Sequence, residues 1–128
     1  MWDKVGMSRN GKDLKAAIEE IQAIRDEFYK EVKVPGDLEG FNEELAKAGR
    51  IADFLELGEL FAKDALNREE SCGGHFREEH QTPEGEAKRD KAFQYVAAWE
   101  HNGAPKDANL HKEMLEYKYI EVKERSYK

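Results

Sequence analysis

The stretch from Asn67 to Thr82 holds the residues of this chain best suited to chemistry. It contains the single cysteine of the sequence, two histidines, two arginines and four glutamates. Cys72, His75 and His80 stand at a C-x2-H-x4-H spacing, which offers sulfur and nitrogen ligands for a tetrahedral zinc site. Zinc sites are usually built from two paired elements, and no second pair lies nearby. We therefore predict no metal site here.

A nucleophilic pair of Cys72 with a histidine is a second possible chemistry, because Arg68 and Arg77 are close to Cys72 in sequence. Such a cysteine needs a lowered thiol pKa. We expect Cys72 close to the C-terminal end of a helix, where the helix dipole raises the pKa of a thiol. The sequence therefore predicts an unreactive cysteine and no catalytic residue. We interpret Gly73 and Gly74 as the C-cap of that helix, because they lack the Lys-Ser/Thr of a phosphate-binding loop.

A simpler alternative is that the charged residues of this stretch form solvated ion pairs that contribute little to stability. Two features favour a more specific role. The two glycines fix the path of the backbone, and rigid polar loops beside helix ends often dock onto partners. The residues alone leave both interpretations open.

The composition limits the fold and the partners. With 128 residues, the chain is long enough for one domain. Hydrophobic residues make up 39% and charged residues 38%, and the mean hydropathy is -0.92, which favours amphipathic helices. The net charge of -7 argues against nucleic acid, and no apolar run approaches the roughly 20 residues of a membrane helix.

Apolar residues at helical spacing predict two long helices. The first covers Leu14 to Val32 and ends before Pro35. The second starts after Asn42, a plausible N-cap, and continues to Asn67. Because two helices do not close a core, we interpret Trp2, Val5 and Met7 as the last turn of a truncated third helix. The expected fold is a mainly α, three-helix, spectrin-repeat-like bundle.

The pattern changes after Gly85. FQYVAAWEH is rich in residues that favour strands, NGAPKDAN resembles a turn, and LHKEMLEYKY alternates Leu115, Tyr117 and Tyr119 on one face. These segments predict a β-hairpin, packed on the helices or on a partner. The aromatic residues lack a basic groove, so we expect them to pack rather than to stack on bases. We thus divide the single domain 1–128 into a helical segment 1–70, a polar loop 71–90, and a hairpin and tail 91–128.

NREESCGGHFREE resembles the R-x-E-S-R-G-x-H-x-R loop in the C-terminal helical domain of succinate dehydrogenase and fumarate reductase flavoprotein subunits. The match falls on Arg68, Glu70, Ser71, Gly73, His75 and Arg77, with Cys72 where many members carry Arg. The resemblance extends over nearly the whole chain. It is nearest to the three-subunit, menaquinone-linked type.

The resemblance implies that this chain is excised from a larger FAD-containing enzyme that interconverts succinate and fumarate. The flavin and every catalytic residue would then lie outside this chain. Docking residues would be Arg68, Glu70, Ser71, His75 and Arg77. Implied partners are the FAD-binding and capping domains and an iron–sulfur subunit, with a membrane cytochrome b as an indirect partner at the cytoplasmic side of the inner membrane.

Two other functions stay open at the level of sequence. L-aspartate oxidase and adenylylsulfate reductase flavoproteins share this architecture and are possible parents. Composition alone also permits a free-standing helical module that binds a protein partner through its acidic faces and aromatic hairpin.

Overall fold

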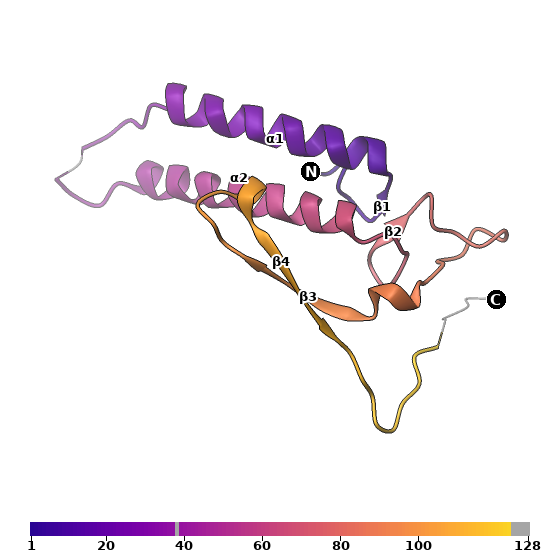
Figure 1. The fold of residues 1–128 in the computed structure, drawn as a ribbon. Helices are drawn as coiled ribbons and strands as arrows, with labels where there is room; N and C mark the ends of the chain where they lie inside the picture. Colours follow the sequence, from indigo (N-terminus) through magenta and orange to yellow (C-terminus); the bar gives the residue numbers. More distant parts are fainter. Residues whose placement is uncertain (38, 124–128) are drawn as a thin grey trace.

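The computed structural model describes residues 1–37 and 39–123, so the end of the predicted tail, 124–128, lies outside the described residues. Two long antiparallel helices lie side by side, and a two-stranded sheet runs along the second one (Figure 1). The elements in chain order are β1 (Ser8–Arg9), α1 (Gly11–Glu31), α2 (Glu43–Asn67), β2 (Phe76–Arg77), η1 (Lys91–Phe93), β3 (Tyr95–Glu100), η2 (Pro105–Asp107) and β4 (Asn109–Met114).

Both long helices confirm the sequence prediction, and both begin with an asparagine N-cap. The side chain of Asn10 accepts a hydrogen bond from the backbone N–H of Asp13 at 2.8 Å, and Asn42 accepts one from Leu45 at 3.0 Å. These bonds satisfy amides that a helix start leaves without partners. The acidic Glu43 in the first turn of α2 also complements the helix dipole.

The apolar core lies between the two helices, at the end where α1 begins and α2 finishes. It is built from Val5, Leu14, Ala17, Ala62 and Ala65. The two alanines of α2 let the helices approach closely over this stretch. Neither α1 nor α2, nor any other described helix, carries an apolar stretch that could span a bilayer.

The prediction of a three-helix bundle was wrong, because only two α-helices form in the described residues. Residues 1–7 make one turn, closed by a bond of 2.8 Å from the N–H of Val5 to the carbonyl of Met1, and then bend. Gly6 disfavours a helix, and its carbonyl accepts a bond from the Arg9 side chain, which leads the chain into β1. Of the three apolar residues, only Val5 reaches the core, whereas Trp2 is 92% exposed.

The predicted β-hairpin is confirmed. β3 and β4 pair in antiparallel fashion from Tyr95 opposite Met114 to Glu100 opposite Asn109. The hairpin is fixed to α2 by the indole N–H of Trp99, which donates to Asp64 at 2.8 Å. The expected alternation beyond it was wrong, because β4 ends at Met114 and leaves Tyr119 outside the strand and 85% exposed.

A second, very short pairing connects distant regions of the sequence. β1 runs parallel to β2, with Ser8 beside Phe76 and Arg9 beside Arg77. This pairing brings the segment before α1 against the loop that follows α2, as Figure 1 shows where the labels β1 and β2 meet. The polar loop therefore covers the end of the helix pair.

Candidate docking loop

The structure places all five residues that were assigned a docking role in one loop after α2: Arg68, Glu70, Ser71, His75 and Arg77. Three of them are almost fully buried, with exposed fractions of 1% for Glu70, 0% for Ser71 and 4% for Arg77. A solvated ion-pair cluster is therefore excluded for these three. Their polar groups must be satisfied inside the domain, because unpaired buried polar groups are costly.

Arg77 satisfies the carboxyl end of α2. Its Nη1 donates to the carbonyls of Ala65 and Leu66, both at 3.1 Å, and its Nε donates to Glu79 at 3.1 Å. The last carbonyls of a helix have no partner inside the helix and carry partial negative charge, which a guanidinium complements. Arg77 is thus the residue that closes α2 and joins it to the loop.

Arg68 and Glu70 connect the loop to the start of the hairpin. Arg68 Nη1 donates to Glu70 Oε1 at 2.8 Å and to the carbonyl of Phe93 at 2.9 Å. The other oxygen of Glu70 accepts from the backbone N–H of Asp90 at 3.0 Å. Arg68 also stacks over the ring of Tyr95, 5.0 Å from its centroid. The buried charge of Glu70 is therefore compensated by Arg68, by the more distant Arg89 at 3.9 Å, and by a backbone donor.

Ser71 and Gly73 shape the turn at the tip of the loop. The Ser71 hydroxyl accepts from the N–H of Arg77 at 2.8 Å and donates to its carbonyl at 3.2 Å. Gly73 has φ +59, which favours glycine, and sits between the bridged residues Cys72 and His75. The expected C-cap role was wrong, because α2 ends at Asn67 and Arg68 takes the cap position in an extended conformation.

His75 has both ring nitrogens engaged. Nδ1 lies 2.6 Å from Arg9 Nη1, and Nε2 lies 2.9 Å from the carbonyl of Arg68. Since a guanidinium can only donate, Nδ1 accepts and Nε2 carries the proton, which is the neutral form. Burial, followed by the charges of Arg9, Arg77 and Arg68, lowers the pKa of His75, and the bond to the carbonyl opposes this only in part.

These bonds decide what His75 can do. With both nitrogens occupied, it is available neither as a metal ligand nor as a base for the half-buried thiol of Cys72. Among the described residues, no three His, Cys, Asp or Glu side chains lie close enough together to hold a metal ion.

Arg9 is the member of the site that sequence reasoning missed. It is 8% exposed and belongs to β1. It contacts His75, which lies 66 residues later in the sequence. Its guanidinium also lies over the ring of Phe61, 5.2 Å from the centroid. Its only signal in the sequence was an arginine directly before a helix cap, which is too common to be informative.

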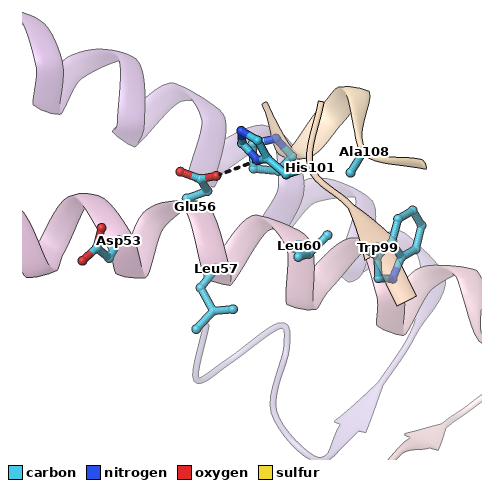
Figure 2. A pocket seen from close by; sticks show the side chains of 8 residues that line it. Asp53, Glu56, Leu57, Leu60, Trp99, His101 and Ala108 are labelled. Carbon is cyan, nitrogen blue, oxygen red and sulfur yellow. Dashed lines mark ion pairs between the residues drawn. The ribbon is translucent and has the colours of Figure 1, made fainter. Parts of the chain in front are cut away.

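A separate hollow of about 240 Å³ lies between α2 and the turn of the β-hairpin. Leu60 and Trp99 form some of its apolar lining, and the carboxylate of Glu56 points toward the ring of His101, 3.3 Å away (Figure 2). This ion pair is exposed and contributes little stability. The hollow shares no residue with the loop described above.

Comparisons with known proteins agree with this architecture. A protein family described as the fumarate reductase flavoprotein C-terminus matches residues 1–127. The FrdA chain of a mutant quinol fumarate reductase from E. coli has a similar fold, with a TM-score of 0.75 over 93% of this chain at 21% identity. This chain covers 20% of that one.

Two curated relatives are similar in sequence. A fumarate reductase (CoM/CoB) subunit of Methanothermobacter marburgensis is 34% identical over 70% of this chain, which spans 16% of that protein. An FAD-dependent oxidoreductase of Methanocaldococcus jannaschii is 37% identical over 62% of this chain, which spans 14% of it. With a family match over nearly its whole length and the matching fold, this chain belongs to the fumarate reductase flavoprotein C-terminal domain family.

Proposed function

We propose that this chain acts as the C-terminal docking domain of a flavoprotein that reduces fumarate or oxidises succinate. The observation that carries the proposal is the loop from Arg68 to Arg77, which is held by buried Glu70, Ser71 and Arg77, exposes its tip, and lies within the family match over residues 1–127. The relative from M. marburgensis is named as a fumarate reductase subunit, which supports this reaction. The oxidoreductase chemistry itself belongs to the rest of the parent enzyme.

The described residues do not fit an FAD site. The only parallel strand pair among them has two residues on each side, far too short for a dinucleotide-binding unit. The start of α1 is also unavailable to a pyrophosphate, because the N–H of Gly11 donates to the carboxylate of Glu79. In this proposal the flavin is held by the parent chain outside these residues.

Docking would use surface that the domain leaves uncovered beside the loop. The buried members of the loop hold its shape, and its tip presents Gly74, which is exposed. The outer face of α2 carries exposed apolar side chains at helical spacing, with Phe54 at 66%, Leu57 at 61% and Phe61 at 50%. A contiguous exposed apolar face marks a surface that another protein surface covers.

The partners follow from the same proposal. The FAD-binding and capping domains of the parent chain would receive the loop, and an iron–sulfur subunit would contact the assembled flavoprotein. A membrane cytochrome b would be an indirect partner, which would place the complex peripherally at the cytoplasmic side of the inner membrane. The acidic chain has no role with nucleic acid in this scheme.

The test is a matched pair of glycine substitutions in the full-length parent enzyme. Gly74→Trp adds bulk at the loop tip. Gly49→Trp adds the same bulk on α2, on a different side of the helix from Phe54 and Phe61 by helical spacing. A Cβ at either glycine would meet no atom within 4 Å, so both positions are open where the new side chain begins. We expect Gly74→Trp to lower flavin retention and fumarate reduction by about tenfold or more, equivalent to about 1.4 kcal/mol of docking energy, and Gly49→Trp to leave both unchanged.

Equal behaviour of the two variants would contradict a docking role of the loop. A parent enzyme that oxidises L-aspartate but neither reduces fumarate nor oxidises succinate would replace the proposed reaction while leaving the docking role intact. If the chain instead proved stable and bound no flavoprotein segment, the free-standing interaction module would be the better description.

A further inference from the structure

A hollow of about 340 Å³ lies between α2 and the docking loop, apart from the hollow of Figure 2. Its wall combines two arginines, one aspartate, and aromatic and small residues, among them Arg9, Phe61, Asp64, Arg68, Gly74 and His75. Gly74 at the loop tip and Phe61, which is 50% exposed, both line it. The hollow therefore opens at the surface proposed for docking.

Arg9 is buried in this wall without a carboxylate at ion-pair distance among the described residues. The residue is 8% exposed, and its guanidinium contacts the carbonyl of Gly6, the neutral ring of His75 and the face of Phe61. Within the described residues, no carboxylate lies within ion-pair distance of this guanidinium. Buried charges are normally paired, so a buried guanidinium that has only neutral hydrogen-bond partners can accept an anion.

The other charges of the wall do not supply that anion. Arg68 already pairs with Glu70, and Arg77 behind it pairs with Glu79. Asp64 faces the hollow and attracts Arg9, but it accepts its hydrogen bond from the indole of Trp99. Burial and the charge of Arg77 lower the pKa of Arg9, and Asp64 opposes this only in part. Arg9 is therefore the guanidinium of this wall that has no ion-pair partner among the described residues, although Asp64 lies close enough to attract it.

We propose that this hollow is an anion site that binds one carboxylate group on the guanidinium of Arg9. A carboxylate suits a planar guanidinium, since it accepts two parallel N–H bonds. Arg68 also lines the hollow but is already paired with Glu70, so the proposal rests on Arg9. Phe61 would contact the aliphatic portion that carries the carboxylate. The carboxylate comes either from an acidic side chain of the parent enzyme, which rests on the proposed function, or from a small free molecule.

The first experiment uses acetate on the 128-residue chain. The Nε–H resonance of Arg9 is followed by ¹⁵N NMR while sodium acetate replaces sodium chloride at constant ionic strength. We expect a saturable shift of this resonance, which Arg9→Gln abolishes together with all acetate-induced shifts around the hollow. The matched control is Arg50→Gln, an exposed arginine on α2 that should leave the titration unchanged. A response to acetate no larger than that to chloride would overturn the site.

A second variant keeps the test valid if Arg9→Gln does not fold. Asp64→Asn retains the oxygen that accepts from Trp99 but removes the negative charge that competes with the ligand. It should tighten acetate binding by about threefold, the effect of a unit charge several ångström away in a water-like medium. Weaker or unchanged binding in Asp64→Asn would contradict an anion held by Arg9.

A third measurement identifies the source of the carboxylate. In the full-length parent enzyme labelled with ¹⁵N-arginine, an acidic side chain already in the hollow would leave Arg9 shifted and insensitive to acetate. If the natural ligand is a free carboxylate, acetate should shift the Arg9 resonance in the parent enzyme as it does in the 128-residue chain. Acetate binding to the 128-residue chain tests the anion site, and Gly74→Trp in the parent enzyme tests the docking function. Either result can be negative while the other is positive, so the two proposals can fail separately.

Discussion

The two ends of the helix pair are built in opposite ways. At the end where α1 begins, buried Leu14 packs against α2, and Arg77 closes the last turn of α2 from the loop. At the other end, large apolar residues face outward, with Val32 at 45%, Leu45 at 47% and Phe41 at 93% exposure. The same two helices therefore have a closed end, where residues of this chain cover the apolar side chains, and an open end, where those side chains stay exposed.

This difference shows where the stability of the domain is generated. The closed end combines a small apolar core with buried polar groups that are nearly all paired. The open end has neither, and its apolar surface gives no stability until something covers it. Substitutions should therefore have large effects toward the closed end and small effects toward the open end.

The largest effect is expected at the boundary between the two halves. Glu59 of α2 is fully buried, pairs with Arg25 of α1 and accepts from Gln22 at 2.7 Å. Arg25→Met leaves this carboxylate buried without a cation, which should cost about 3–5 kcal/mol of unfolding free energy. Urea unfolding of the wild type and of Arg25→Met measures this loss of unfolding free energy. The double variant Arg25→Met with Glu59→Met should recover much of the loss, and failure to recover would show that packing, not charge, was lost.

The next effect is expected in the closed end itself. Ser71 is 0% exposed, and its hydroxyl holds both the N–H and the carbonyl of Arg77. Ser71→Ala leaves two buried backbone groups without this partner, at a cost of about 1–3 kcal/mol by urea unfolding. Ser8→Ala is the matched control and should be nearly neutral, because the bond from its hydroxyl to Glu78 is exposed. An equally neutral Ser71→Ala would mean that water replaces the hydroxyl.

A pH-dependent effect of intermediate size should arise from His75. Its pKa is lowered in the folded chain below the usual 6.5, mainly by burial, so the unfolded chain binds a proton more readily. Stability from this group is therefore complete above about pH 6.5 and is lost as the pH falls toward the folded pKa. Thermal unfolding between about pH 7.5 and 5.5 should show the loss in the wild type and a weaker slope in His75→Gln. Parallel slopes would assign the pH dependence to other groups.

The smallest effect is expected at the open end. Phe41 is 93% exposed in the segment before α2, so Phe41→Ser removes almost no buried area. The unfolding free energy should change by less than about 0.5 kcal/mol, as for other surface positions. A loss above about 1 kcal/mol would show that the open end is already covered, for example by a second copy of the chain, and the concentration dependence of unfolding would test that.

The sequence predicts the local elements of this fold better than its long-range contacts. Asn42 and the helical spacing place α2 well, because capping and periodicity are read from neighbouring residues. The prediction of a third helix was wrong, because three apolar residues before Ser8 fit a turn as well as the end of a helix. The expected role of Gly73 was wrong for a related reason, since a positive φ serves a β-turn as readily as a helix cap.

The residues of the candidate site also differ in whether local sequence can predict them. Its five loop residues are close in sequence, so a local motif could find them. Arg9 pairs with this loop only through the parallel contact of β1 and β2, and no local pattern predicts which distant segment pairs with a short loop. The division of the chain into segments 1–70, 71–90 and 91–128 stays a prediction.

The pairing of β1 with β2 also has a consequence for the order of folding. These strands join Ser8 to Phe76 across the whole helix pair, so the contact forms only after both helices have met and the intervening chain has been closed. We expect the helix pair to fold first and the loop to lock last. Weakening β1 should then speed unfolding while leaving the folding rate nearly unchanged.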